Sequence, residues 1–499
     1  MLARPSRKTL LTAAAAVAVL LGAAGIVVTS TGPESTAGSR PNIVFVLTDD
    51  MDSGLLRYMP QARKLQADGV SFSNYTVTNS LCCPSRASIF TGQFPHNTGV
   101  LTNNPRNGGY AAFLRNDLEK VTFGVALQEQ GYRTAMMGKY LNGYEPLGLM
   151  PGAGYVPPGW DVWAVSGSAG YRSFDYTVNE NGWMVGYGRE PADYMTDVLS
   201  TRGNAFIRDS VDAGDPFLLE IATYAPHGPF TPAPRDAHKF PGLETPRDPS
   251  FGEPDVSDKP KWVRNQPRLS RADIARSNTD HRRRAQSMQA VDRMLGRLRA
   301  TLAQTGQADN TYVVLSSDNG FHLGQHRLLT GKKTPYSTDV NVPLIVAGPG
   351  VPAGKTRQQI AENVDLHATF TDIGGKPSAG TDGRSLLPIL RGRPVRGWKT
   401  SALVEHHGPN NNRSDPDYQP SRNANPPSYD ALRTATSTYV EYETREREYY
   451  DRRRDPYELT NIYASLPTAK RQSLHRQLTA LRKCRGTAAC TKAAGGRYR

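Results

Sequence analysis

Short apolar runs that end in polar residues recur along this chain. Each is six to eight residues long, and most are rich in Val, Ile and Leu, which is typical of strands buried on both faces of a parallel sheet. The runs occupy residues 41–48, 132–137, 217–222, 311–316 and 342–347. Between them, apolar residues recur at helical spacing, as in the segment from Met288 to Leu298. The alternation predicts an α/β fold, a large, mostly parallel sheet sandwiched by helices.

The pattern changes after about residue 376. Residues 408–428 are rich in Asn, Pro and Ser and predict a loop. Alternating segments at 438–443 and 446–450 are joined by a tight turn and predict an antiparallel hairpin. Residues 469–483 predict a closing amphipathic helix with its leucines on one face.

The N-terminus has the pattern of an export signal. Arg4, Arg7 and Lys8 form a basic start, and residues 10–28 are uncharged and mostly apolar. The same segment fits an uncleaved anchor, because its length is close to that of a membrane span. Either way, we expect the protein to be secreted or held at the cell surface.

These patterns divide the chain of 499 residues into three parts. We expect a signal peptide or anchor at residues 1–38, and a main α/β domain with the candidate catalytic residues at 39–375. Residues 376–499 are expected to form a smaller α+β subdomain that carries a short antiparallel sheet.

Composition narrows the classes of protein. With 38% hydrophobic and 21% charged residues, the chain can bury a core, and wholesale disorder is excluded. The net charge of +14 favours an anionic partner, which charge alone leaves open as nucleic acid, a membrane surface, an acidic small molecule or a glycan. No motif supports nucleic-acid binding, and Arg282–Arg284 is interpreted as the solvated face of a helix. The four cysteines are too few for a disulfide scaffold and do not have zinc-site spacing.

Polar residues with catalytic potential follow the ends of the predicted strands. In open α/β sheets, ligands bind beyond the carboxyl ends of the strands, so these residues are expected to form one site. They are Asp49, Asp50, Lys139, His227, Asp318 and Asn319. The four Asp and Asn residues offer only oxygen ligands, which suit Ca²⁺ or Mg²⁺ rather than zinc. Helix capping is the alternative role for Asp49 and Asp50.

A second motif runs from Cys82 to Gly92. Pro84 and Ser85 favour the start of a helix, which places Cys82 near free N–H groups that attract an anion. The fork of donors on Arg86 can hold an anionic oxygen. The alternatives are a vicinal disulfide between Cys82 and Cys83, a buried thiol, or a cysteine-protease pair with His227.

The segment Cys82-Cys83-Pro84-Ser85-Arg86, followed by Thr91-Gly92, resembles the Cys-x-Pro-Ser-Arg motif of the formylglycine-dependent sulfatases, which belong to the alkaline-phosphatase-like superfamily. Two further segments, 138–142 and 342–346, resemble the branch of N-acetylglucosamine-6-sulfatases and endosulfatases. The run at 450–461 resembles the common C-terminal element of sulfatases.

The resemblance implies a set of roles. Cys82, rather than Cys83, would be converted to Cα-formylglycine by a formylglycine-generating enzyme, and its hydrated aldehyde would be the nucleophile. The modified Cys82 would share Ca²⁺, or less readily Mg²⁺, with the four Asp and Asn residues named above. Arg86, Lys139, His227 and Lys332 would complete the catalytic set.

Further implications concern single residues. A disulfide would join Cys484 and Cys490. Leu141 stands where many arylsulfatases have a histidine, so the group that deprotonates the formylglycine hydrate is not identified. His96, His322 and His326 are candidates for the lining of the pocket.

The expected function is that of a secreted sulfatase acting on sulfated glycans with a 6-sulfated, glucosamine-like group. His227 or Lys332 would protonate the leaving alcohol. Two alternatives remain open at this point: a phosphonate or phosphate ester hydrolase of the same superfamily, and a non-enzymatic polyanion-binding module.

Overall fold

The computed structural model describes residues 40–377, 379–413, 415 and 417–497. Residues from Arg40 onward form one compact unit. The predicted signal or anchor at residues 1–38 lies outside the described residues. In the part of the chain that is described, no helix is both long and apolar enough to cross a membrane.

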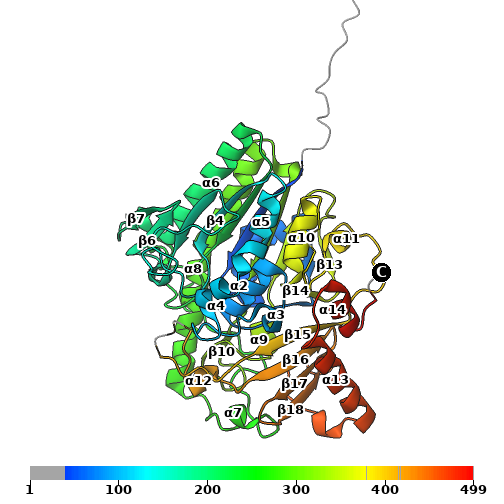
Figure 1. Ribbon diagram of the computed structural model, residues 1–499. Helices are drawn as coiled ribbons and strands as arrows, with labels where there is room; N and C mark the ends of the chain where they lie inside the picture. Colours follow the sequence, from blue (N-terminus) through cyan, green and yellow to red (C-terminus); the bar gives the residue numbers. More distant parts are fainter. Residues whose placement is uncertain (1–39, 378, 414, 416, 498–499) are drawn as a thin grey trace, which may run out of the picture. The chain divides into compact units, whose positions relative to one another are not determined.

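The main sheet has ten strands among the described residues (Figure 1). In spatial order they are β13 (Lys355–Arg357), β2 (Val70–Phe72), β12 (Leu344–Ala347), β9 (Thr311–Ser317), β1 (Asn42–Thr48), β8 (Phe217–Ala222), β4 (Arg133–Lys139), β5 (Val162–Ser166), β6 (Tyr176–Glu180) and β7 (Trp183–Tyr187). The central strands β9, β1, β8, β4 and β5 all run parallel. All five predicted strands are present.

The direction of one predicted strand was wrong. The run at 342–347 was expected to be a parallel strand, but β12 lies antiparallel to both β9 and β2. Its apolar sequence reflects burial on both faces, which either direction allows. The antiparallel strands β6 and β7 extend the far edge of the sheet and were not predicted.

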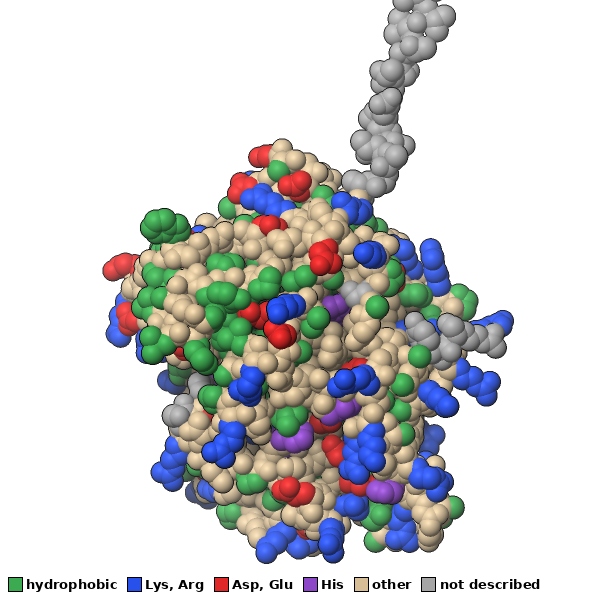
Figure 2. Space-filling view, viewed as in Figure 1, with side chains coloured by type: hydrophobic (Ala, Val, Ile, Leu, Met, Phe, Trp, Pro, Cys, Tyr) green, Lys and Arg blue, Asp and Glu red, His purple; other side chains and the backbone are tan. Residues whose placement is uncertain are grey.

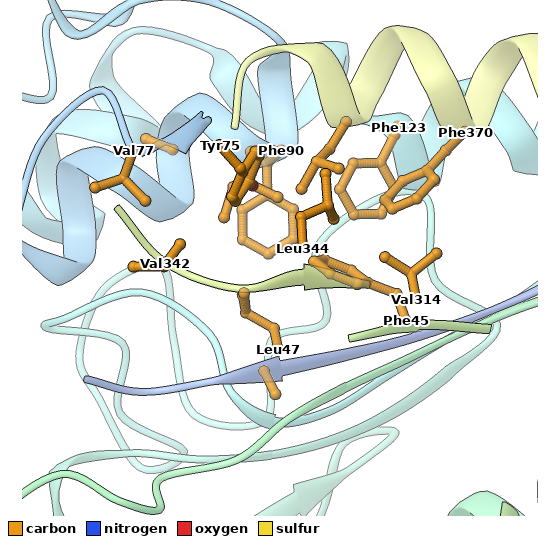
Figure 3. Close-up of a cluster of buried hydrophobic side chains, with 14 of the residues drawn as sticks. Phe45, Leu47, Tyr75, Val77, Phe90, Phe123, Val314, Val342, Leu344 and Phe370 are labelled. Carbon is orange, nitrogen blue, oxygen red and sulfur yellow. The ribbon is translucent and has the colours of Figure 1, made fainter. Parts of the chain in front are cut away.

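Helices cover both faces of this sheet (Figure 1). Val44 and Val46 of β1 pack with one set, α1 (Pro60–Asp68), α6 (Met195–Ala213) and α8 (Arg271–Gln304). Phe45 and Leu47 point to the other side, toward α2 (Cys82–Thr91), α5 (Phe123–Gln128) and α10 (Asp365–Ile373). Figure 3 shows this second layer, where the rings of Phe45 and Phe370 lie 5.1 Å apart. The predicted sandwich is confirmed, and the helical segment from Met288 to Leu298 is the middle of α8.

A second sheet is antiparallel throughout. Its strands, in order, are β15 (Ser401–His406), β16 (Tyr429–Thr434), β17 (Ser437–Tyr442) and β18 (Arg447–Asp451). The predicted hairpin is β17–β18. The predicted closing helix is α13 (Thr468–Leu481), whose buried Leu474, Leu478 and Leu481 pack on this sheet. It is followed by α14 (Thr487–Ala493), and the predicted disulfide between Cys484 and Cys490 is present.

Shorter elements connect these layers. The helices are α3 (Pro95–Thr98), α4 (Gly109–Arg115), α7 (Lys261–Arg264), α9 (Ser337–Val340), α11 (Leu387–Leu390) and α12 (Ser421–Ala424). Two small strand pairs, β10 (His322–Leu323) with β11 (Thr330–Gly331) and β3 (Tyr75–Thr76) with β14 (Ala361–Glu362), complete the described structure.

Candidate functional site

The predicted polar residues lie together at the carboxyl ends of the central parallel strands. Asp49 and Asp50 follow β1, Asp318 and Asn319 follow β9, and Lys139 is the last residue of β4. His227 lies in the loop after β8. Because these strands are parallel neighbours, their carboxyl ends meet, and the single site predicted from the sequence forms there.

Cys82 is the first residue of α2 and is completely buried. Its Sγ lies 3.1 Å from Asp49 Oδ1 and 3.9 Å from Asp50 Oδ1. Burial, together with the carboxylates of Asp318 and Asp417, raises the pKa of the Cys82 thiol well above its usual range. An unmodified Cys82 is therefore held neutral, unlike the activated thiolate of a cysteine hydrolase.

Cys83 faces away from this cluster into the apolar core. Its backbone N–H donates to Asn103 Oδ1 at 3.1 Å. Both thiols are free, which excludes the vicinal disulfide. Only Cys82 of the pair contacts the candidate catalytic residues.

Arg86 lies one turn after Cys82 on the same side of α2 and has no exposed surface. Its Nε donates to Asp318 Oδ2 at 2.7 Å, and its Nη1 donates to the Lys139 carbonyl at 2.8 Å. Its Nη2 has no hydrogen-bond partner among the described residues and lies 4.0 Å from Asp49 Oδ1. Arg86 thus contacts residues at the ends of three strands, β9, β4 and β1, and its Nη2 is left as a donor for a ligand.

Two lysines donate hydrogen bonds to the two aspartates of the cluster. Lys139 Nζ donates to Asp49 Oδ2 at 2.6 Å. Lys332 Nζ donates to Asp50 Oδ1 at 2.6 Å and to Cys82 Sγ at 2.8 Å. The neighbouring Lys333 instead donates to the Asp417 carbonyl at 2.6 Å. Of this adjacent pair, Lys332 is the one that reaches Cys82.

The candidate metal ligands comprise one close group and two residues that are hydrogen-bonded to it. Ligand atoms of Asp49, Asp50, Cys82 and His227 all lie within 4.8 Å of one another. Asp318 Oδ1 accepts from the Asp50 N–H at 3.2 Å, and Asn319 Nδ2 donates to Asp50 Oδ1 at 2.6 Å. The buried Oδ1 of Asn319 has no partner among the described residues. This free oxygen beside two carboxylates fits a hard divalent cation.

Arg284 supports Asp50 and corrects one interpretation. The run Arg282–Arg284 was expected to be solvated, but Arg284 is completely buried. Its Nη2 donates to the Asp50 carbonyl at 2.7 Å and to Asp52 Oδ2 at 2.8 Å, and its guanidinium stacks on Phe321. Asp50 has a left-handed backbone with φ of 68°, which is rare for a residue with a side chain. Arg284 holds it there, a role that charge alone did not reveal.

Asp417 is a site residue that sequence reasoning missed. It comes from the loop at 408–428 and is buried. Its Oδ1 lies 2.9 Å from His227 Nε2 and 2.5 Å from Lys332 Nζ. Asn103 and Asn142 donate to its other oxygen at 2.5 and 3.2 Å. Burial opposes ionisation of Asp417, but the neighbouring Lys332 and His227 outweigh it and hold the pKa of Asp417 well below its usual range. The only sequence signal was a long polar loop, which does not single out one residue.

Two cavities adjoin the cluster. One, of about 270 Å³, is lined by Asp50, His227 and Asp417 together with Phe230 and Arg276. The other, of about 280 Å³, is lined by Lys139, Asn142, Tyr171 and Asp415, among others. Substrate can therefore approach the buried cluster from the surface.

The three histidines named as pocket candidates lie elsewhere. His96 pairs with Glu405, His322 with Asp339, and His326 with Glu253. None of them lines either cavity. His326 lines a third cavity, of about 300 Å³, together with Tyr336 and Glu458. Leu141 is buried and lines the second cavity together with Asn142, whose side chain also donates to Asp417.

Comparison with known proteins gives concordant matches. The sulfatase family profile matches residues 41–376, and that of the N-sulphoglucosamine sulphohydrolase C-terminal region matches residues 324–484. The chain is 34% identical to N-acetylglucosamine-6-sulfatase of Homo sapiens over 480 residues, which cover 90% of this chain and 85% of that protein.

Two further matches, one to a curated relative and one to a solved structure, cover different shares of the matched chain. Over 383 residues the chain is 38% identical to an extracellular sulfatase Sulf-1 homologue of Caenorhabditis elegans, covering 74% of this chain and 52% of that protein. The chain thus spans about half the length of that relative. A solved structure of a protein in complex with its substrate D-glucosamine-2-N,6-O-disulfate has a TM-score of 0.73 and 25% identity, over 89% of this chain and 98% of that one.

Proposed function

Because this chain belongs to the sulfatase family, a family of sulfuric ester hydrolases, we propose that it removes sulfate from a sulfated glycan, with a 6-sulfated glucosamine as the target group. The observation that carries this proposal is the position of Cys82, buried at a helix start between Lys332 and a group of carboxylates. The names of the human relative and of the substrate complex support the choice of glucosamine.

Cys82 is the residue we propose to be converted to Cα-formylglycine by a formylglycine-generating enzyme during maturation. The hydrated aldehyde supplies an oxygen nucleophile that a neutral thiol does not provide. The free Nη2 of Arg86 and the ammonium of Lys332 are the donors placed to orient it.

Asp49, Asp50, Asp318 and Asn319 are the proposed ligands of a divalent cation, which we assign as Ca²⁺ because all four offer oxygen. When bound, such a cation supplies Lewis-acid charge that offsets the charge of a sulfate ester. His227 also lies within ligand distance of this group. Because its Nε2 keeps a proton toward Asp417, we place it beside the cation rather than among the ligands.

Lys139 and Lys332 are the proposed sulfate-binding cations. The Lys139 ammonium contacts Asp49 and the Lys332 ammonium contacts Asp50, and Cys82 lies beside both aspartates, so both cations are close to an anion placed at Cys82. In a buried site a charged hydrogen bond is stronger than one in water, because the local dielectric constant is lower.

His227 is the proposed general acid for the leaving alcohol. Its Nδ1 faces the Gly228 carbonyl at 2.8 Å, and its Nε2 faces Asp417 at 2.9 Å. Since both neighbours are acceptors, each ring nitrogen carries a proton in this arrangement. The Nε2 proton is the one that borders the cavity and can be given to the departing oxygen.

We also propose that the protein acts outside the cell. The export signal predicted at residues 1–38 supports this, and the nematode relative is named as an extracellular sulfatase.

The test compares three substrates: N-acetylglucosamine 6-sulfate, an aryl sulfate and an aryl phosphonate. We expect release of sulfate from the sugar and the aryl sulfate, with a much lower kcat/KM on the phosphonate. A higher kcat/KM on the phosphonate would establish the competing phosphoester reading. No turnover of any substrate by fully modified protein would leave the polyanion-binding module as the better account.

A further inference from the structure

The positive charge of this protein is strongly segregated. Residues 40–375 hold 34 Lys and Arg against 33 Asp and Glu, so the part that supplies most of the catalytic residues is close to neutral. Residues 376–499 hold 23 Lys and Arg against 12 Asp and Glu. Within them, the segment 459–499 has nine Lys and Arg and no acidic residue. The positive charge is therefore concentrated in the last two helices and their flanks.

The fold turns these cations to solvent. On α13, Leu474, Leu478 and Leu481 face the second sheet, and at about 100° per residue Arg476 falls on the opposite side. Lys483 follows the end of this helix. Both are exposed. Four more cations along the segment are exposed as well: Lys470, Arg485, Lys492 and Arg497. We call these six residues the basic face.

The basic face is not neutralised by the chain itself. In residues 459–497 the ion pairs are Arg482 with Asp430 and His475 with Glu441, and neither involves the six. Exposed arginines elsewhere do have acidic partners, such as Arg189 with Asp175 and Arg235 with Asp197. The six cations are therefore available to bind an anion from outside the protein.

The basic face is also held in a fixed shape. The Cys484–Cys490 disulfide links the end of α13 to α14, and the Cys484 carbonyl accepts from Asn97 Nδ2 at 2.8 Å. The Arg497 N–H donates to the Gly397 carbonyl at 2.8 Å, which brings Arg497 beside the exposed Arg396. Figure 2 shows Lys and Arg side chains gathered at the lower right, over α13 and α14.

This surface is separate from the catalytic site. None of its six residues lines either cavity beside Cys82. Arg485 contacts Asn97 in α3, which follows the C-terminal end of α2, whereas Cys82 is the N-terminal residue of α2. The ten residues of α2 alone separate these ends by about 14 Å.

We propose that the basic face is a second, non-catalytic binding site for the polyanionic chain of the substrate, a sulfated glycan longer than the group that enters the pocket. This rests on the proposed function for the identity of the glycan. Single exposed charge pairs contribute little, on the order of 0.2–1 kcal/mol each. Several that bind one chain act together, and a chain held at one point is presented to the pocket at high effective concentration.

Two other polyanions are less compatible with the surface. A membrane-binding helix needs an apolar face to insert, but the leucines of α13 are buried against the sheet. Single-stranded nucleic acid is usually bound by stacking on aromatic side chains. In residues 459–497 the only Phe, Trp or Tyr is Tyr463, whose ring already stacks on Tyr439. Bound glycan needs only sulfate and carboxylate contacts, for which Arg and Lys suffice.

The test compares two variants that each lose four positive charges. One changes the basic face: Lys470→Gln, Arg476→Gln, Lys483→Gln and Lys492→Gln. The control changes four exposed, unpaired cations of α1 and α8: Arg63→Gln, Lys64→Gln, Arg283→Gln and Arg297→Gln. Neither set includes a residue that we place in the catalytic machinery.

The first measurement is the Kd for a sulfated glycosaminoglycan decasaccharide, by calorimetry at low and physiological salt. We expect the basic-face variant to bind at least about tenfold more weakly and with a smaller salt dependence, while the control stays within about twofold. Equal weakening in both variants would overturn the proposal in favour of bulk charge. Equal affinity of the unaltered protein for a single-stranded DNA of the same charge would overturn the assignment to glycan.

The second measurement is kcat/KM on a sulfated decasaccharide and on N-acetylglucosamine 6-sulfate. We expect the basic-face variant to lose efficiency on the decasaccharide alone. Equal loss on both substrates would show that the changes act through the pocket and would end the proposal. If the unaltered protein turns over neither substrate, the proposed function fails, and the calorimetric comparison still decides whether the basic face binds the polymer.

Discussion

Cys82 and Cys83 are adjacent in sequence but differ in surroundings, and this difference gives a first prediction. Cys82→Ala should reduce kcat/KM by at least about 10³-fold, because it removes the proposed nucleophile. Cys83→Ala should retain most of the activity, since the Cys83 side chain lies in the apolar core and has no contact with Asp49, Asp50 or Lys332 among the described hydrogen bonds. Steady-state kinetics and the mass of the peptide that contains both residues provide the readout. The reverse pattern would refute the assignment.

Asp417 gives a second prediction at the same scale. Asp417→Asn removes the charge that holds the Nε2 proton of His227, so proton donation to the leaving group should weaken. We expect kcat on a sugar sulfate to fall about 10- to 100-fold, with a smaller loss on an aryl sulfate whose leaving group needs little protonation. His227→Asn should change the ratio of the two rates in the same direction. Equal losses on both substrates would assign Asp417 to general binding instead.

The sequence allowed the strand-end residues to be predicted, but not those that support them. Asp49, Lys139 and Asp318 are recognisable because each follows an apolar run. Asp417 lies in an irregular loop, and Arg284 lies in a basic run that looks solvated. Whether such residues turn inward depends on which segments pack against them, and this is decided by the folded chain.

At the scale of single elements, strand β8 contains an unusual acid. Glu220 is completely buried, neither carboxylate oxygen has a hydrogen-bond partner among the described residues, and burial raises its pKa to about 8. The unfolded chain releases this proton near pH 4.5, so the folded state binds more protons between the two values. Stability is therefore expected to fall as pH rises from 4.5 to 8.

The corresponding prediction concerns Glu220→Gln, which keeps the shape and cannot ionise. Relative to this variant, the unaltered protein should lose on the order of 4 kcal/mol of unfolding free energy between pH 4.5 and 9. Chemical denaturation of both proteins at the two pH values measures the difference. A parallel pH response in the two proteins would mean that Glu220 has a partner that compensates its charge.

The elements themselves were largely predictable because burial on both faces leaves an uninterrupted apolar run. Strand direction was not, since β12 has the same pattern as its parallel neighbours. Strands β6 and β7 were missed because β7 is partly exposed at the sheet edge and its Trp183 faces solvent, which dilutes the apolar signal. The hairpin β17–β18 was found because its turn interrupts a regular alternation.

At the scale of the whole molecule, the proposed cation site at the ends of β1 and β9 predicts that stability depends on the cation. Adding Ca²⁺ should raise Tm, and at about 100 times its Kd the gain is about 2.7 kcal/mol. Asp318→Ala should abolish the shift, whereas Asp273→Ala, a change in the N-terminal capping box of α8, should retain it. Calorimetry with and without a chelator provides the test. A shift produced by Zn²⁺ but not by Ca²⁺ would contradict the oxygen-ligand assignment.

The complete burial of Cys82 constrains how this protein is made. An enzyme that modifies a side chain needs to surround the residue and its neighbours, and α2 offers no accessible surface there once it is packed between Asp49 and Lys332. The proposed conversion therefore has to precede folding, on a chain that is still extended. On this proposal, a molecule that folds first keeps its thiol and stays inactive. The fraction of active enzyme is then expected to depend on the competition between two rates during synthesis rather than on the stability of the finished protein.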